Sequence, residues 1–425
     1  MKILIIGHNA LSENNNMGKT LLSYFMGSDP NEIAEFYIQD KDPCNASVAN
    51  RYYRITDKEA LKSLFGYKVG KSFYLENSMP ETVANTKGKS EFIRQYGRKR
   101  NALVYIVRNL IWSLSHWRNK KLINWLHSFD PDVIFFMAGD YSFMYKIAIA
   151  IKELLNKPMV VCCVDDFFFY NRNENTLLGR LQYNSYMKIV FKAMNMSSCI
   201  LTISDSMREA YHNLFNKPCF TLHTSAIKRH TDKKHGKRIA YFGNLGYRRY
   251  EQLLDIGKTV KLLGINGING IDVYSGERNP DILVGLTEEN GIYFHGEISS
   301  DKVSQVMDDC MAIIHTESFD NDIQKMIKYS ISTKIADSLM NGPCLIAYGP
   351  KGIASIDYLE KNKAAYVITS VKDLEKGMRE IISDEELRRQ IVCNARNLAN
   401  QNHKIEINPL KVKQWLKMAI DDSFN

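Results

Sequence analysis

Short apolar, β-branched runs alternate along the chain with longer segments whose apolar residues recur at helical spacing. In the first half this pattern predicts strands at 3–7, 34–38, 132–137, 158–164, 198–203 and 219–223. Later it predicts strands at 239–243, 271–275, 291–295, 311–315, 344–348 and 365–368, with helices at 249–263, 301–309, 333–341, 371–382 and 384–400. Such alternation indicates parallel sheets with crossover helices, and therefore the α/β class.

A polar, basic stretch without apolar periodicity, residues 226–238, separates the two sets of strands. We therefore expect two doubly wound, Rossmann-like domains facing a cleft, with boundaries at 1–228 and 229–405. The remaining segment, 406–425, is expected to form a helix that packs back onto the first domain.

Composition limits the compartment and the cofactor. The 425 residues carry a modest formal charge of +9 and eight cysteines, several of them in apolar runs such as "MVVCCV". Because no two cysteines form a C-x-x-C pair, we expect buried thiols in a reducing cytosol, with no disulfide framework and no metal site. The first apolar run is too short for a signal peptide, and no run approaches the ~18 residues of a spanning helix. A cytoplasmic protein is expected.

The first predicted strand is followed by "NNNMGKT", which suggests a nucleoside-triphosphate loop. A P-loop requires four residues between its glycines, whereas ten separate Gly7 from Gly18. One alternative is a polar loop before a helix that starts near Gly18, with Lys19 as a solvated lysine. Another is that Gly18 and the helix N-terminus face an anion bound by the other domain.

The stretch "YFGNLGYRRY" joins a strand to a helix through Gly243 and Gly246. The glycines permit close approach of a ligand, and Arg248 or Arg249 adds charge suited to a diphosphate. Many αβ units carry glycine at this turn, so the signal is weak when taken alone.

A longer stretch, residues 315–350, predicts a strand, a long polar loop and a helix that opens with "STK". Ser332 and Thr333 can cap this helix, while its free N–H groups and Lys334 face an anion. Asp337 shares a helix face with Lys334, which suits a diphosphate beside a ribose. The alternative is a well-capped surface helix.

Other polar residues follow predicted strands directly. Ser275 and His295 do so in the second half, although a lone histidine at a strand end is more often structural. In the first half, Asp140, Asp165 and Asp166 are placed to bind an acceptor hydroxyl or take its proton. Capping of the next helix is the competing interpretation for each carboxylate.

The second half resembles the retaining glycosyltransferases with two Rossmann domains, the GT-B fold, in their bacterial capsule and surface-polysaccharide branch. "STKI", "DSLMNGPCLIA" and "YGP" carry the resemblance, and "YFGNLG", with Asn244, resembles the diphosphate loop of that family. Asp337 stands where a family glutamate holds the ribose, but Tyr329 stands where a second glutamate would precede it. The nearest upstream glutamate, Glu317, is a candidate catalytic group.

The resemblance covers about 230–400 well and the first half only in outline. It implies transfer of a sugar from a nucleotide-diphosphate sugar to a lipid-linked or oligosaccharide acceptor in bacterial surface-polysaccharide synthesis, without a cofactor or an obligatory metal. It also implies that Gly18 faces the donor or the acceptor across the cleft, and that Asp140 and Asp166 belong to the acceptor side. The alternatives are a sugar-nucleotide epimerase or hydrolase on the same fold, a P-loop kinase or NTPase, and a non-catalytic membrane adaptor.

Residues 94–121 contain eight Lys/Arg and no acid, together with Trp112 and Trp117. Leu103, Val107, Leu110, Leu114 and Trp117 recur at helical spacing. This pattern favours an in-plane helix on anionic lipid, at the inner face of the plasma membrane. The alternative is a helix packed on its own sheet. No nucleic-acid motif accompanies the charge, so we expect no nucleic-acid partner.

Overall fold

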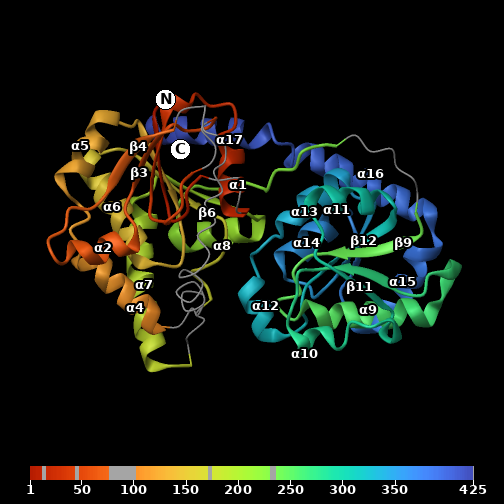
Figure 1. The fold of residues 1–425 in the computed structure, drawn as a ribbon. Helices are drawn as coiled ribbons and strands as arrows, with labels where there is room; N and C mark the ends of the chain where they lie inside the picture. Colours follow the sequence, from red (N-terminus) through yellow and green to blue (C-terminus); the bar gives the residue numbers. More distant parts are fainter. Residues whose placement is uncertain (12–15, 44–46, 76–101, 171–174, 230–235, 425) are drawn as a thin grey trace. The chain divides into compact units, whose positions relative to one another are not determined.

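The computed structural model describes residues 1–11, 16–43, 47–75, 102–170, 175–229 and 236–424 (Figure 1). They form two compact units. The first unit consists of Met1–Leu222 and Asn408–Asn425, and the second unit is His223–Ile407.

The first unit contains an eight-stranded sheet in the order β4-β3-β2-β1-β5-β6-β7-β8. Its strands are β1 (Ile3–Gly7), β2 (Ile33–Tyr37), β3 (Arg51–Arg54), β4 (Lys71–Tyr74), β5 (Val133–Met137), β6 (Met159–Cys163), β7 (Cys199–Thr202) and β8 (Cys219–Thr221). Every neighbouring pair is parallel except β3 and β4 at the edge. The central strands are buried on both faces, which explains their continuous apolar runs.

Helices connect these strands, as the parallel pairing requires. They are α1 (Asn16–Tyr24), α2 (Asp57–Ser63), α4 (Ala102–Leu114), α5 (Lys120–Phe129), α6 (Ser142–Leu155), α7 (Leu177–Met196) and α8 (Asp205–Phe215). The last helix of the chain, α17 (Ile407–Ile420), also packs in this unit: Leu416 belongs to its core, and Trp415 stacks on Phe220 with ring centroids 4.9 Å apart.

The second unit contains a six-stranded, all-parallel sheet in the order β11-β10-β9-β12-β13-β14. Its strands are β9 (Arg238–Phe242), β10 (Ile271–Tyr274), β11 (Ile292–Gly296), β12 (Cys310–Thr316), β13 (Cys344–Tyr348) and β14 (Tyr366–Ile368). The chain runs outward from β9 in one direction through β10 and β11, and in the other through β12, β13 and β14. The strand order therefore reverses between β9 and β12.

Two apolar cores cover the two faces of this sheet, because successive strand residues point to opposite sides. Ile313 and Leu345 face the core with α13 (Thr333–Asn341), α14 (Ala354–Lys361) and α16 (Glu385–Asn402). Ile314 and Ile346 face the core with α9 (Arg249–Leu263) and α15 (Leu374–Ser383). Helices α10 (Pro280–Leu283), α11 (Ser300–Asp308) and α12 (Asn321–Ile327) also belong to the unit.

The predicted α/β class is confirmed, and the predicted parallel strands form within about one to two residues of their expected positions. Three features differ from the prediction. Strands β3 and β4 extend the first sheet, and α12 interrupts the stretch expected to be a polar loop. The assignment of acceptor and donor binding to the two units stays a prediction.

Candidate functional site

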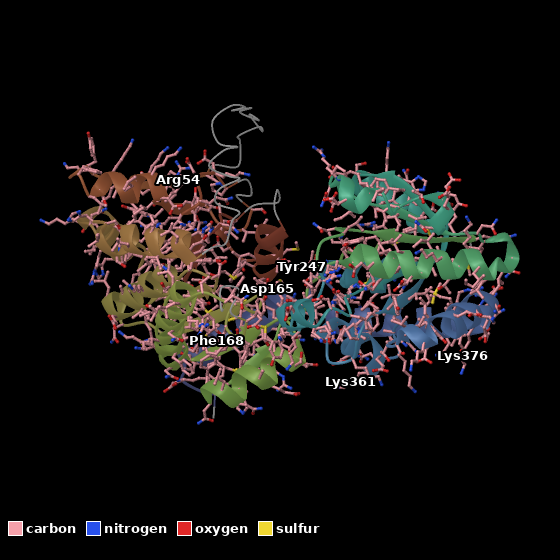
Figure 2. All side chains as sticks on the ribbon, turned by 90° about the horizontal axis from the view of Figure 1, so that it is seen from below. Arg54, Asp165, Phe168, Tyr247, Lys361 and Lys376 are labelled. Atoms are coloured by element: carbon pink, nitrogen blue, oxygen red, sulfur yellow. The ribbon has the colours of Figure 1, made fainter. Side chains whose placement is uncertain are left out.

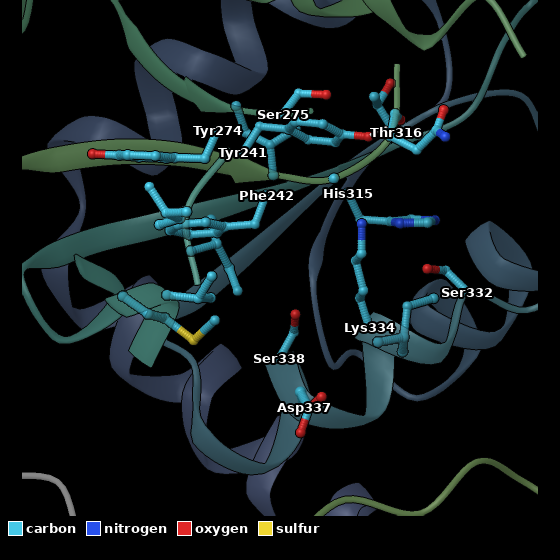
Figure 3. A pocket seen from close by; sticks show the side chains of 18 of the residues that line it. Tyr241, Phe242, Tyr274, Ser275, His315, Thr316, Ser332, Lys334, Asp337 and Ser338 are labelled. Atoms are coloured by element: carbon cyan, nitrogen blue, oxygen red, sulfur yellow. Dashed lines mark hydrogen bonds between the residues drawn. The ribbon is translucent and has the colours of Figure 1, made fainter. Parts of the chain in front are cut away.

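A cavity of about 630 Å³ lies where β9, β10 and β12 end, beside the start of α13 (Figure 3). This is the position at which open α/β sheets bind ligands, because the strand order reverses there. Its polar wall includes Gly243, Asn244, Arg249, Ser275, His315, Thr316, Ser332, Lys334, Asp337 and Ser338. Its apolar wall includes Phe242, Tyr274, Ile298, Val303, Met307, Ile313 and Ile335. The cavity thus has the mixed character typical of a small-molecule site.

Three cations line this cavity, Lys334, Arg249 and Arg229, together with the acids Asp337, Glu277 and Glu297. Lys334 and Arg249 lie beside the start of α13. Burial, followed by the charge of Arg249, lowers the pKa of the Lys334 ammonium group to about 8. The Lys334 Nζ lies 2.6 Å from the point where a Cβ on Gly243 would stand, so glycine at 243 leaves room for it. Two cations held this close favour an anionic ligand, whose binding relieves their repulsion.

The N-terminus of α13 borders the same cavity. Ser332 stands at the N-cap position with extended backbone, but its side chain makes no capping bond to the helix. The predicted side-chain cap is therefore wrong for Ser332, and the first N–H groups of α13 are not used by it. Lys334 and Asp337 both line the cavity, as their three-residue spacing predicts, whereas Thr333 is not part of the wall.

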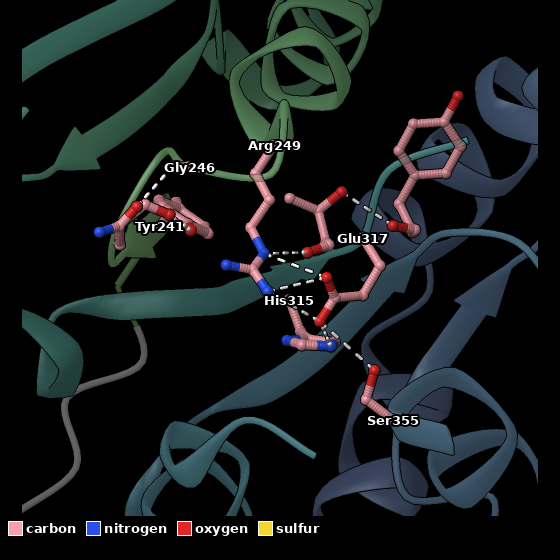
Figure 4. A network of polar contacts seen from close by, with 9 residues as sticks. Tyr241, Gly246, Arg249, His315, Glu317 and Ser355 are labelled. Carbon is pink, nitrogen blue, oxygen red and sulfur yellow. Dashed lines mark hydrogen bonds and ion pairs between the residues drawn. The ribbon is translucent and has the colours of Figure 1, made fainter. Parts of the chain in front are cut away.

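Arg249 is held by a buried ion pair with Glu317 (Figure 4). The guanidinium donates to Glu317 Oε2 from Nε at 3.1 Å and from a terminal nitrogen at 2.9 Å, and Nε also donates to the Thr316 carbonyl at 3.2 Å. Glu317 is 3% exposed and is not part of the cavity wall. Burial raises the pKa of its carboxyl and Arg249 opposes that shift. Glu317 is thus paired with Arg249 behind the wall, and its catalytic role stays a prediction.

The turn after β9 decides which of the two adjacent arginines reaches the cavity. Tyr247 and Arg248 both have left-handed backbone, with φ of 58° and 56°. Arg248 points to Glu251 and Asp320, forming ion pairs with both, and is not part of the wall. The next residue begins α9 and enters the cavity.

Asn244, unlike Arg248, lines the cavity, and it also holds the turn after β9. Its side-chain oxygen accepts from the Gly246 N–H, and its carbonyl accepts from the Tyr241 hydroxyl at 2.7 Å. Ser275 also lines the cavity and is buried. His295 is not part of the wall: it pairs with Asp272 and stacks on Tyr274, with ring centroids 4.6 Å apart. The structural interpretation of His295 fits this arrangement.

His315 lines the cavity and was not singled out from the sequence. Burial, Arg249 and Lys334 together lower the pKa of its imidazole to about 3, so the ring is neutral at physiological pH. Its Nε2 lies 3.4 Å from Glu317 Oε1 and has no hydrogen-bond partner among the described residues. The alternation of strand residues could have predicted this position: His315 is two residues beyond Ile313, so its side chain lies on the same face of the sheet, toward α13.

The remaining candidates lie in the first unit. Gly18 is buried as the third residue of α1, and the side chain of Lys19 lies outside the described part. Asp140 follows β5 and accepts from the Tyr105 hydroxyl at 2.7 Å. Asp166 follows β6, beside the labelled Asp165 and Phe168 of Figure 2, and is 5% exposed.

The bonds of Asp166 favour its structural interpretation. Its Oδ1 accepts from the backbone N–H groups of Phe168 and Phe169 at 3.0 and 3.1 Å, and from the Tyr211 hydroxyl at 3.3 Å. Burial raises the pKa of this carboxyl. Asp166 thus shapes the turn after β6.

A polar cluster beyond β1 was missed in the sequence. The His8 ring accepts from Arg108 at 2.8 Å, and Arg108 forms an ion pair with Asp57 at 3.0 Å. The Arg108 guanidinium also lies 4.1 Å from the ring centre of Tyr141. Burial, together with Arg108, lowers the pKa of His8 to about 4. The cluster joins α2 and α4 to the carboxyl end of β1.

Two searches of the described residues gave negative results. No group of three or more His, Cys, Asp or Glu side chains in the described part is arranged to hold a metal ion. None of the described helices has both the length and the apolarity needed to cross a membrane.

Comparison with known proteins identifies the fold. No family model and no curated protein matches the chain. HepE of Anabaena, solved in complex with UDP, superposes with a TM-score of 0.64 at 11% identity, covering 98% of this chain and 100% of HepE. WaaG, a glycosyltransferase involved in lipopolysaccharide biosynthesis, gives a TM-score of 0.56 at 10% identity, covering 97% and 99%. Sucrose-phosphate synthase of Thermosynechococcus elongatus gives 0.57 at 10% identity, covering 99% and 100%.

These structures define the class: the chain has the GT-B fold, with two α/β units whose sheets are mostly parallel. HepE is also solved with UDP-glucose, at a TM-score of 0.60 and 12% identity.

Proposed function

We propose that this protein is a glycosyltransferase that moves a sugar from a nucleotide-diphosphate sugar to an acceptor. One observation carries the proposal: Lys334, Arg249 and the uncapped N-terminus of α13 converge on one cavity at the switch point of the second sheet. Positive charge from two side chains and a helix end suits the diphosphate of a sugar nucleotide. The GT-B fold, and the UDP and UDP-glucose bound by HepE, support this choice of ligand.

In the proposed mechanism this positive charge acts on the departing diphosphate. Charge builds up on the leaving oxygen as the glycosidic bond breaks, and cations already in place stabilise that charge without reorganising. Asp337 accepts hydrogen bonds from the ribose hydroxyls on the same side of α13. Gly243 and Asn244 admit the diphosphate close to the backbone, and no metal ion is needed for these roles.

We propose Asp140 as the carboxylate of the first unit that binds the acceptor hydroxyl. Asp140 follows the central strand β5, and its carboxylate accepts a hydrogen bond from the Tyr105 hydroxyl. Asp166 is engaged by the turn that follows β6, and Glu317 by Arg249, so we assign both to positioning. Gly18 is proposed to let a substrate approach the start of α1.

The finer assignment is a retaining hexosyltransferase of bacterial surface-polysaccharide synthesis, acting on a lipid-linked or oligosaccharide acceptor in the cytoplasm. Its support is the resemblance carried by "STKI" and "DSLMNGPCLIA", together with the lipopolysaccharide role stated for WaaG. We also propose peripheral contact with an anionic membrane within residues 94–121.

A transfer assay tests the proposal. The purified chain is screened against a panel of nucleotide sugars for thermal stabilisation, because a ligand that binds the native state raises Tm by mass action. The best donor, labelled in the sugar, is then incubated with and without candidate acceptors. The expected result is acceptor-dependent transfer that Asp337→Asn reduces and the exposed control Asp322→Asn does not.

Other products identify the competing functions. Label converted without an acceptor would identify an epimerase or a hydrolase. Acceptor-dependent loss of the ATP γ-phosphate would identify a kinase. No stabilisation by any nucleotide sugar would refute the donor site itself.

A further inference from the structure

Helix α4 (Ala102–Leu114) turns an apolar face outward. Leu103, Val107, Leu110 and Leu114 are 60%, 47%, 56% and 59% exposed. Their spacing of four, three and four residues places all four on one stripe of the helix. An ordinary surface helix turns its apolar stripe toward the core, so α4 has the reverse arrangement on this side.

The orientation of α4 is fixed by its other side. Trp112 is 1% exposed, stacks on Phe143 with ring centroids 4.9 Å apart, and donates from Nε1 to Asp57 at 2.7 Å. Tyr105 is buried and donates its hydroxyl to Asp140. These bonds prevent the helix from turning its outward stripe inward. They also bury Trp112, which the sequence suggested as a membrane anchor.

The surroundings of the stripe are basic. Neither α4 nor α7 (Leu177–Met196), which packs against it, contains Asp or Glu. Lys146 donates from Nζ to Ser113 Oγ at 3.2 Å, which holds its ammonium group on the outward side of α4. Arg118 follows the helix and is exposed. The first turns of α7 add exposed Leu177 and Leu181.

We propose that the outward stripe of α4, Leu103, Val107, Leu110 and Leu114, lies in the interface of an anionic lipid bilayer, with Lys146 and Arg118 beside the lipid headgroups. An interfacial helix gains from buried apolar area and from attraction between basic residues and anionic lipid, and α4 supplies both. α4 and α7 carry no acid, and the two acids of α2, which also packs against α4, are engaged: Asp57 pairs with Arg108, and Glu59 accepts from the Thr56 N–H at the start of its own helix. The inference rests on the membrane contact proposed above and deepens it by naming the residues that enter the lipid, and it does not involve the donor cavity.

The test uses the full chain and vesicles of phosphatidylcholine, with and without phosphatidylglycerol. We expect sedimentation with the mixed vesicles only, and less binding as salt rises. Leu110→Gln combined with Leu114→Gln should weaken binding at least about tenfold, since burying even part of each leucine stabilises the bound state. Lys146→Gln should weaken binding roughly fivefold, the effect of one basic residue near an anionic surface.

Matched controls lie in exposed positions elsewhere. Leu262 and Leu410 are 79% and 69% exposed, so the pair Leu262→Gln and Leu410→Gln should bind vesicles as the wild type does. Lys361 and Lys376 lie on the second unit (Figure 2), and Lys361→Gln or Lys376→Gln should have no effect. All these variants change exposed side chains, and unchanged Tm values would verify that each one folds.

Three results would overturn the proposal. The first is a wild type that sediments with neither kind of vesicle at low salt. The second is a Leu110/Leu114 variant that binds as tightly as the wild type. The third is a dimer, detected by light scattering without lipid and dissociated by the same variant, which would identify a second copy of the chain as the occupant. Sugar transfer to a water-soluble acceptor is measured without vesicles. A failure to bind vesicles therefore leaves the proposed reaction unaffected, and a failure of transfer leaves the proposed membrane contact unaffected.

Discussion

Replacement of Lys334 by alanine tests the donor cavity most directly. The ammonium group shares the cavity with Arg249, and none of the ion pairs among the described residues includes it. A charge-assisted hydrogen bond contributes about 1.5–3 kcal/mol. Loss of that bond should weaken binding of a nucleoside diphosphate roughly 10- to 150-fold. Isothermal titration at neutral pH measures the change, with the exposed Lys361→Ala as control.

The pH dependence of binding separates this mechanism from a general loss of structure. Because the pKa of Lys334 is lowered to about 8, the cation is lost as pH rises through that value. Wild-type affinity should therefore fall between about pH 7 and pH 9, whereas Lys334→Ala should lack this dependence. Lys334→Arg keeps its charge over the whole range, so its affinity should not show this fall either.

The stability of the variant should follow the opposite sign. The folded-state pKa of Lys334 lies below the usual 10.5, so the unfolded state binds the proton more strongly. Stability from this residue is thus present above pH 10.5 and is lost as pH falls through about 8. Lys334→Ala should then have an unchanged or slightly higher Tm at neutral pH. Unchanged affinity for every nucleoside diphosphate, or the same fall with pH in the alanine variant, would refute the reasoning.

Three further changes have distinct outcomes. Gly243→Ala places a Cβ 2.6 Å from the Lys334 Nζ and 2.8 Å from the hydroxyl of the buried Tyr241, so titration should show weaker nucleotide binding. Tm should fall as well, because the lysine end can move but the tyrosine is held by its bond to the Asn244 carbonyl. Glu317→Gln leaves the Arg249 charge buried without its partner, so the free energy of unfolding in urea should fall by about 3–5 kcal/mol. A loss of turnover at unchanged stability would instead indicate that Glu317 is a catalytic carboxylate. Burial raises the pKa of Glu35 to about 8 from the usual 4.5, so between these values the folded state keeps a proton that the unfolded state releases. The free energy of unfolding should therefore fall by about 1.4 kcal/mol for each unit that the pH rises in this range. Glu35→Gln should remove that slope in urea titrations at several pH values.

The sequence was sufficient to predict the parallel strands because both faces of each are buried. Runs such as "VIFFM" of β5 must be continuously apolar in a sheet covered on both sides, and that pattern is visible without a structure. β3 ("RYYR") and β4 ("KSFY") lie at one edge of the first sheet. Their charged residues and tyrosines conceal the strand pattern, so both escaped prediction.

Within the site, residue type and spacing predicted Lys334 and Asp337, since three residues along a helix return to one face. The choice between Arg248 and Arg249 was not predictable in this way. It depends on left-handed backbone at two successive non-glycine residues, which sequence patterns do not indicate because such residues rarely adopt it.

The charges of the cavity show why a buried carboxylate supports an anion site. Arg249 alone beside Lys334 would leave two cations repelling each other in a partly dry space, and each would lower the other's proton affinity. Glu317, placed behind Arg249 and outside the wall, offsets one of these charges and fixes the guanidinium through bonds at 3.1 and 2.9 Å. The Arg249 guanidinium therefore keeps its place beside Lys334 while the carboxylate behind it offsets its charge. In the proposed donor site a diphosphate would meet both oriented cations, and the empty protein does not hold both charges uncompensated.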